Sequence, residues 1–319
     1  MGLLCGLAAA AIWGGGSAVL RHLVTSGLGP ADLTLLRYVG CFPVALAALF
    51  LMGDRIWLGI TWPRLAVLLI LGGPLYHAIV VAGYGYASAG GGALLMSGLL
   101  PVFAIGLHWI VTSTTPPRTK VIGTIAVLAG LVWFGLGAGS ILSPAGVVLF
   151  AIAAAAWAVL NELVRRWQVD PLRLTVSLAL FAPAFAPLYL LTGSGAVLAS
   201  PPEDLLLQIV YHGWLVAIGA TALFFLAVRL AGTEIAAVLQ TASPGFAAIF
   251  GAAILNEPLL PAQIGGLMLV TVGVLLSVSD RVSDRLSRWR VIHLVPKRRG
   301  SLFKLTRQPR PNCWSRTRA

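Results

Sequence analysis

The chain has 319 residues, of which 58% are hydrophobic and only 10% are charged. Soluble domains usually carry about 25% charged residues, and this composition excludes a disordered chain, a collagen-like fibre and a disulfide-rich secreted domain. A single soluble core of this length would have to bury more apolar surface than it can hide. A bilayer instead solvates outward-facing apolar side chains, and each span needs only about 20 residues. The composition therefore predicts an all-α integral membrane protein.

The net charge of +12 is concentrated at one end of the sequence. Residues 281–319 contain 12 Lys/Arg and one acidic residue, whereas residues 1–280 contain 10 Lys/Arg and 9 Asp/Glu. A nucleic-acid-binding domain would spread its basic residues over a folded surface, so nucleic acid is not a predicted partner. A basic tail directly after the last apolar segment is typical of the cytoplasmic side and of contact with anionic lipid.

Apolar runs and their interruptions predict ten transmembrane helices. In chain order they are expected at residues 2–20, 32–52, 64–86, 90–112, 119–138, 144–164, 173–192, 205–228, 233–255 and 260–279. With a cytoplasmic N-terminus, eight Lys/Arg fall in the inner loops and only Arg21 falls in an outer loop. The eight are Arg55, Arg64, Arg118, Lys120, Arg165, Arg166, Arg173 and Arg229. Because cytoplasmic loops are enriched in Lys/Arg, both termini are expected in the cytoplasm.

An internal repeat relates the two halves of the sequence. A shift of 143 residues places 93–123 on 236–266, so that Pro101 meets Pro244. A shift of 144 places Trp13 on Trp157 and Arg21 on Arg165.

Each half then holds five helices, and an odd number means that the halves enter the membrane in opposite directions. Inverted repeats are a recurrent plan of secondary transporters. The predicted organisation is therefore two inverted five-helix repeats, 1–138 and 139–280, followed by a basic cytoplasmic tail, 281–319.

Several motifs in this order carry a family resemblance. They are AAAIWGGGSAV with Trp13 and Gly14, LTLLRYVG with Arg37, the prolines of the fourth and ninth helices, PGFAAIFGAAILNEP with Glu257, and IGGLMLVTVGVLL. Over residues 2–280 the chain resembles the drug/metabolite transporter superfamily, specifically its EamA-type members with ten helices. In one departure from that pattern, Thr114 stands in the first half where Glu257 stands in the second.

The resemblance implies a transporter of amino acids, other polar metabolites or drug-like compounds. The function predicted here is alternating-access transport, with export favoured, of a small polar metabolite or drug-like compound across the plasma (bacterial inner) membrane. A non-transporting membrane scaffold or regulator is the alternative. An integral-membrane enzyme is less favoured, because the five histidines form no HxxxH or HxxE set and the three cysteines form no metal motif. No cofactor or metal is predicted. The expected partners are the lipid bilayer and a small-molecule substrate, while a proton or ion gradient and a homodimer are left open.

Polar side chains within the spans are the candidate functional residues, because a charge at the bilayer centre costs about 2.5–3.5 kcal/mol. Arg37 lies where it either reaches the headgroups or attracts anionic substrate groups. His77 and Tyr84 are seven residues apart on one helical face, and His77 and His108 each either make one structural hydrogen bond or contact substrate. Glu257 either ends a helix or contributes to a gate or to coupling.

The fourth and ninth helices are expected to border the pathway. Ser97, Pro101, Ala104 and His108 recur on one helical face, and proline frees the carbonyl four residues earlier. The candidate pathway residues are Trp13, Arg37, His77, Tyr84, Ser97, Pro101, His108, Gln240 and Pro244, with Glu257 as the gate or coupling candidate. A structural ion pair is expected between Glu162 and Arg166, four residues apart near the end of a helix.

Overall fold

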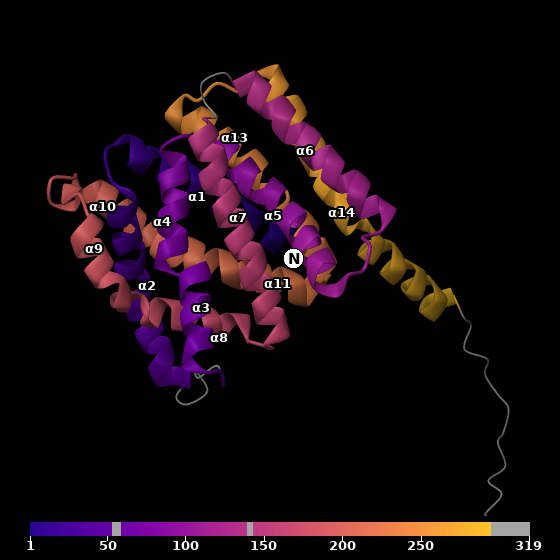
Figure 1. The fold of residues 1–319 in the computed structure, drawn as a ribbon, viewed down its shortest axis with the longest axis horizontal. Helices are drawn as coiled ribbons and strands as arrows, with labels where there is room; N and C mark the ends of the chain where they lie inside the picture. The colour runs from indigo at the N-terminus through magenta and orange to yellow at the C-terminus, as the bar shows by residue number, and fades with distance from the viewer. Residues whose placement is uncertain (53–58, 139–142, 295–319) are drawn as a thin grey trace, which may run out of the picture. The chain divides into compact units, whose positions relative to one another are not determined.

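The computed structural model describes residues 1–52, 59–138 and 143–294, and its elements are helices joined by turns (Figure 1). In chain order they are α1 (Gly2–Thr25), α2 (Pro30–Met52), α3 (Trp62–Gly72), α4 (Pro74–Tyr84), α5 (Ala89–Thr112), α6 (Arg118–Ala138), α7 (Pro144–Arg166), α8 (Pro171–Leu180), the 3₁₀ helix η3 (Ala182–Phe185), α9 (Ala186–Thr192), the 3₁₀ helix η4 (Ala196–Leu198), α10 (Pro202–Gln208), the π-helix η5 (Ile209–Ala220), α11 (Thr221–Ala231), α12 (Thr233–Gln240), α13 (Ser243–Leu255) and α14 (Pro261–Leu294).

Residues 1–282 form one compact unit, and residues 283–319 belong to a second. The second unit includes the last turns of α14, which ends at Leu294. The predicted end of the last span at residue 279 therefore falls inside a longer helix. Residues 295–319, and with them most of the predicted basic tail, lie outside the described part of the chain, as does Arg55.

Eight helical segments of the described chain are long and apolar enough to cross a membrane. The bent pair 173–180 and 182–192, with an angle of 43°, makes a ninth if it forms one span, and the apolar helix Pro261–Ser277 is shorter. The multi-pass helical membrane fold is thus confirmed. The finer expectation of ten membrane-spanning helices in two inverted repeats is not confirmed by these lengths.

Proline and glycine explain where the expected spans are interrupted. The third span divides at Gly73, whose extended backbone precedes Pro74 at the start of α4. The seventh divides around η3, which begins next to Pro183. The ninth divides before Pro244, which lies in the first turn of α13. Pro lacks the N–H that would continue the preceding helix and is well tolerated in a first turn. Pro101, by contrast, lies inside the continuous helix α5.

Helix α1 packs against α13, α11, η5, α12 and α5. Its three consecutive glycines each leave room for a different neighbour. A Cβ at Gly14 would lie 2.6 Å from the carbonyl oxygen of Ser243 in α13, and one at Gly15 would overlap the Tyr211 hydroxyl. A Cβ at Gly16 would lie 3.2 Å from Nε2 of His212 in η5. The WGGG motif therefore permits close approach of α1 to two other helices.

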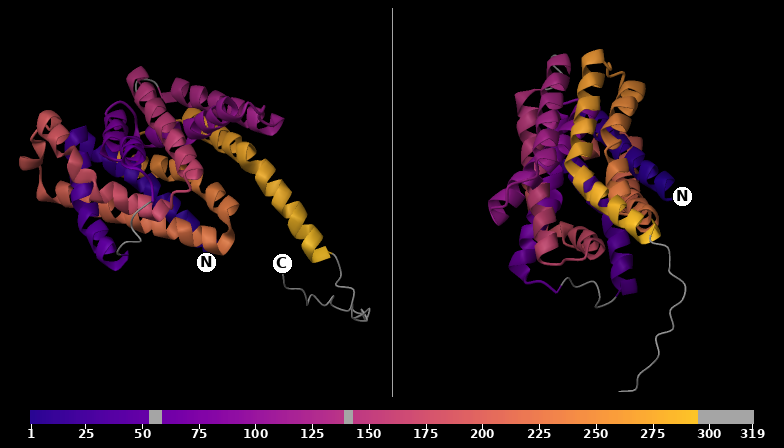
Figure 2. Two further views of the ribbon diagram at one scale, coloured as in Figure 1. Left: turned by 60° about the horizontal axis from the view of Figure 1, so that its bottom comes forward. Right: turned by 90° about the vertical axis from the view of Figure 1, so that its right-hand side faces the viewer.

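Helices α6 and α14 lie side by side, as Figures 1 and 2 show for the part of α14 within the first unit. A Cβ at Gly123 would lie 2.6 Å from the carbonyl oxygen of Gly273, and one at Gly130 would lie 2.9 Å from that of Gly266. The seven-residue spacing of these glycines on both helices keeps them along one line of contact.

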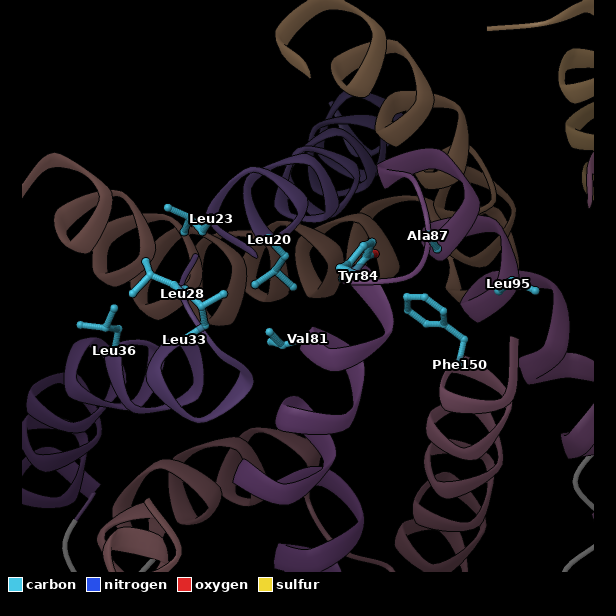
Figure 3. Close-up of a cluster of buried hydrophobic side chains, with 10 residues drawn as sticks. All are labelled: Leu20, Leu23, Leu28, Leu33, Leu36, Val81, Tyr84, Ala87, Leu95 and Phe150. Carbon is cyan, nitrogen blue, oxygen red and sulfur yellow. The ribbon is translucent and has the colours of Figure 1, made fainter. Parts of the chain in front are cut away.

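The largest cluster of buried apolar residues joins α1, α2, α4, α5 and α7 (Figure 3). Leu20 and Leu23 of α1 lie near Leu33 of α2, while Phe150 of α7 contacts Tyr84 at a ring-centroid distance of 5.1 Å. This cluster fixes the helix ends that surround the first polar site described below.

Candidate functional site

Hydrogen bonds and pocket walls define two groups of helix ends. The group named here the Arg21 end contains the last turns of α1, α4 and α13 and the first turn of α5. The group named the Arg165 end contains the last turns of α5 and α7 and the first turn of α6. Each end carries its own polar site, and a third lies between them in the interior.

The Arg21 end is held by an ion pair between helices of the two halves, named here the Arg21–Glu257 junction. Arg21 Nε donates to Glu257 Oε1 at 3.2 Å, and Arg21 NH1 donates to the carbonyl oxygen of Tyr84 at 2.7 Å. Glu257 also accepts from the backbone N–H of Ala89 at 2.9 Å. One carboxylate and one guanidinium therefore join the ends of α1, α4, α5 and α13.

Local structure explains the position of Glu257. Helix α13 ends at Leu255, and Asn256 adopts a left-handed conformation with φ of 53°. The backbone N–H of Glu257 then bonds the carbonyl oxygen of Gly251 at 3.2 Å. Its side chain meets the free N–H groups in the first turn of α5, where a negative charge is favoured by the helix dipole.

The Arg165 end contains a pocket of about 400 Å³, named here the Arg165 pocket. Its walls come from the end of α5, the connection to α6 and the end of α7, and its polar residues include His108, Thr114, Lys120 and Arg165. Thr114 bonds Thr112 through their hydroxyls at 2.6 Å. The pocket thus combines basic groups with hydroxyl groups.

The acidic residue of this pocket is paired within its own helix. Glu162 bonds Arg166 Nε at 2.6 Å and Arg165 NH2 at 2.7 Å. The predicted ion pair of Glu162 and Arg166 is therefore confirmed, with Arg165 as an additional partner. Arg165 remains 62% exposed, so its guanidinium is accessible beside the pocket.

Between the two ends lies a group of polar side chains from α2, α4, α10 and the π-helix, named here the central cluster. Its members are Thr34, Arg37, His77, Gln208 and His212. The Thr34 hydroxyl and His77 Nδ1 are 3.1 Å apart, and the rings of His77 and His212 are 6.2 Å apart. Arg37 lies one turn after Thr34 in α2, and its positive charge acts on both rings.

Contacts between α2 and the eighth span hold this cluster in place. Gln208 Nε2 donates to the carbonyl oxygen of Leu33 at 2.8 Å, and Trp214 Nε1 donates to that of Gly40 at 2.9 Å. His212 lies within the 12-residue π-helix η5. π-Helical turns are rare and occur frequently at functional sites.

An apolar groove of about 490 Å³ borders the central cluster. Its walls are parts of α2, α4, η3 and α9, and Thr34 and Tyr38 are among the residues that line it. Thr34 therefore belongs both to the groove and, through its bond to His77, to the cluster.

The structure brings some of the predicted pathway residues together and separates others. Arg37 and His77 both have unpartnered buried atoms in the central cluster, and Pro101 and His108 line the Arg165 pocket. Tyr84 instead lies in the apolar cluster of Figure 3, with its hydroxyl bonded to Ser17 at 2.8 Å.

The remaining candidate residues line neither the apolar groove nor the Arg165 pocket. Trp13 packs on Phe224 with ring centroids 5.6 Å apart. Ser97 is half-buried in α5, Gln240 is exposed at the end of α12, and Pro244 is buried at the start of α13. The predicted face of α5 lines the Arg165 pocket with Pro101, Ala104 and His108, whereas the matching residues Gln240 and Pro244 line neither the groove nor the pocket.

Several polar residues of these sites were not singled out from the sequence. His212 and Gln208 are 2% and 0% exposed and lie within a span. Polar side chains within a span are candidate functional residues, which is the reasoning that singled out His77, and it applies to these two residues as well. Asp32 is fully buried and accepts from the Ser194 hydroxyl at 2.5 Å and the Gly29 N–H at 3.1 Å. Within the residues that the structure describes, no group of three or more His, Cys, Asp or Glu side chains is arranged to hold a metal ion.

These features define a class: a multi-pass helical membrane protein with a buried polar cluster between two polar helix-bundle ends. The model of the EamA-like transporter family matches residues 1–136 and 144–279. The chain belongs to this family, as its motifs predicted, and its members are transporters rather than enzymes.

Two further comparisons find similar proteins. The chain is 29% identical over 217 residues to the uncharacterized protein PA1977 of Pseudomonas aeruginosa, covering 65% of this chain and 71% of that protein. A crystal structure of another protein aligns with this chain with a TM-score of 0.61 and 21% sequence identity. The alignment covers 89% of this chain and 98% of the other. This structural likeness concerns the fold.

Proposed function

We propose that the chain is a secondary transporter that exports a small polar metabolite or drug-like compound by alternating access. The observation that carries the proposal is the difference between the two ends of the bundle. Alternating access requires a central site that is closed on one side and approachable from the other. The Arg21–Glu257 junction closes one end, the Arg165 end has a pocket of about 400 Å³, and a polar cluster lies between them.

We place the Arg165 end in the cytoplasm of the plasma (bacterial inner) membrane, with both termini on that side and the two halves inverted. Basic residues at the ends of α7 and α11, including Arg165 and Arg229, support this orientation. A pocket on the cytoplasmic side supports export, because internal substrate enters there first. Pro101 and His108 then lie at the entrance of the pathway.

Cysteine labelling tests the orientation. In a cysteine-free background, a membrane-impermeant thiol reagent added outside cells is expected to label a cysteine at Ser194 and not one at Gln168. The reverse pattern would overturn the orientation.

A flux screen tests transport itself. The purified full chain in proteoliposomes is loaded with a metabolite library, and efflux is measured with and without an imposed pH gradient. Substrate-dependent efflux that is absent from empty liposomes is expected, and a dependence on the gradient would identify coupling to protons. A correctly inserted protein that moves no compound of the library would contradict the proposal and favour a scaffold or regulator.

A further inference from the structure

The central cluster contains buried polar atoms that the helix contacts leave unused. Among the described residues, the buried side-chain atoms without a hydrogen-bond partner are Arg37 Nε, His77 Nε2, Gln208 Oε1 and His212 Nδ1. All four belong to this cluster. His77 and His212 are 5% and 2% exposed, so water does not reach them freely. Since buried polar groups in native proteins are nearly always hydrogen-bonded, four such atoms in one cluster indicate a ligand that supplies the missing partners.

The charge of the cluster indicates the first requirement on that ligand. A guanidinium stays protonated in proteins, and Arg37 takes part in none of the ion pairs found among the described residues. The acidic residue nearest to it in α2 is Asp32, which is bonded to Gly29 and Ser194 instead. A single positive charge beside the Thr34–His77 pair therefore favours a ligand with a single negative charge.

The two histidines present different requirements. His212 Nε2 lies beside the backbone of Gly16 in α1. When Nε2 carries the ring hydrogen, Nδ1 is an acceptor, which needs a donor on the ligand. When the Thr34 hydroxyl donates to His77 Nδ1, the other nitrogen, Nε2, carries hydrogen and donates to the ligand.

We propose, on the basis of the transporter function above, that the central cluster binds a 2-hydroxy carboxylate. Arg37 Nε and His77 Nε2 donate to the carboxylate, in the manner of charge-assisted hydrogen bonds. The ligand hydroxyl donates to His212 Nδ1, and Gln208 Oε1 is a second acceptor beside it. A hydroxyl fits this position better than an ammonium group, because a second positive charge near Arg37 in a water-poor interior is unfavourable.

Calorimetry on the full chain in lipid nanodiscs tests the charge requirement. The probes are 2-hydroxy-3-methylbutanoate and its uncharged amide. The carboxylate is expected to bind about tenfold more tightly or better, because only it pairs with Arg37. This discrimination should disappear in Arg37→Gln, survive in part in Arg37→Lys, and remain unchanged in the matched control Arg229→Gln, which alters an exposed arginine at the Arg165 end. Equal binding of both probes, or unchanged discrimination in Arg37→Gln, would overturn the proposal.

Two related probes test the hydroxyl requirement. Both 3-methylbutanoate, which lacks the hydroxyl, and valine, which replaces it with an ammonium group, are expected to bind several-fold more weakly than the hydroxy acid. In His212→Phe the difference between the hydroxy acid and 3-methylbutanoate should vanish while the discrimination against the amide persists. Valine binding as tightly as the hydroxy acid would overturn the assignment of a neutral donor.

Calorimetry and the flux screen together distinguish a wrong ligand assignment from a wrong transporter function. If other compounds are exported in the flux screen while the hydroxy acid shows none of these preferences, the ligand assignment is wrong and the transporter function stands. If no compound is exported, the function itself fails, whatever the calorimetry shows.

Discussion

The two ends of the bundle start from related sequences and reach different structures. Arg21 corresponds to Arg165 in the sequence repeat, and Glu257 corresponds to Thr114. At the Arg21 end the arginine crosses to a carboxylate on another helix, at 3.2 Å. At the Arg165 end the arginine pairs with Glu162 of its own helix, and Thr114 lines a pocket. Replacing one acidic residue by threonine removes the link between helices and is accompanied by an open site.

The close backbone approach of α1 to α13 lies farther along the two helices than the Arg21–Glu257 junction. A Cβ at Gly14 would lie 2.6 Å from the carbonyl oxygen of Ser243 at the start of α13, and the counterpart of Gly14 in the repeat is Ala158 of α7, which lines the Arg165 pocket. Helices α5 and α7 pack against each other as α1 and α13 do. The interhelical ion pair is therefore the feature that distinguishes the Arg21 end from the Arg165 end.

Glu257→Gln is expected to have the largest effect. It removes the charge that pairs with Arg21 and weakens the bond to Ala89, at a cost of about 1.5–3 kcal/mol for hydrogen bonds to a charged group. Export should fall roughly tenfold or more, because a difference of about 1.4 kcal/mol changes an equilibrium tenfold. Flux per inserted molecule is the measurement, and Glu203→Gln, an exposed acid at the same end, is the control. Normal flux in Glu257→Gln would show that the junction is not needed for closure.

Thr114→Glu restores the acidic residue at the other end and is expected to slow export several-fold. The new carboxylate lies in the same pocket as Arg165 and Lys120, so pairing with them should narrow the entrance. Thr114→Gln has the same size without the charge and should leave flux nearly unchanged. Combining Thr114→Glu with Glu162→Gln, which releases Arg165, should strengthen the effect, and equal flux in all three variants would contradict the comparison.

Gly14→Ala tests the backbone approach of α1 to α13. The added Cβ meets the Ser243 carbonyl oxygen at 2.6 Å and the Ala247 backbone nitrogen at 2.8 Å, so the helices must separate. Overpacking of this kind typically costs about 1–3 kcal/mol. Thermal unfolding in detergent measures the loss, and Gly245→Ala is the matched control, because a Cβ there has nothing within 4 Å. Equal melting temperatures for the two variants would argue against a close α1–α13 contact.

Glu162→Gln is expected to have the smallest effect. Its arginine partners are 62% and 44% exposed, and exposed ion pairs typically contribute about 0–1 kcal/mol. Melting temperature and flux should both stay close to those of the unmodified chain. A large loss of export would mean that Glu162 takes part in the pathway rather than in helix stabilisation.

Composition and periodicity were sufficient to predict the class of fold, because spans and loop charges are encoded locally. The bounds of α5 and α7 lie within two residues of those expected. The breaks in the third and ninth spans coincide with prolines visible in the sequence, yet Pro101 continues its helix and Pro244 begins one. Whether a proline bends or interrupts a helix depends on the neighbouring helices, which local sequence does not specify.

The sites were predictable only in part. Arg37 and His77 stood out because polar residues in lipid need partners, but the identity of those partners is a matter of tertiary packing. Arg21 was expected in a loop, and the structure places it in the last turns of α1, paired with a residue 236 positions away. Nothing within either segment alone specifies that pairing.

Distances between spin labels test the central claim most directly. In a cysteine-free full chain in nanodiscs, one label pair at Ser26 and Leu259 reports on the Arg21 end, and another at Ser113 and Gln168 reports on the Arg165 end. Glu257→Gln is expected to shift the first pair toward longer distances and the second toward shorter ones in the same sample. Unchanged distances at both ends, or a change at the Arg21 end alone, would contradict the account of two ends that open in alternation.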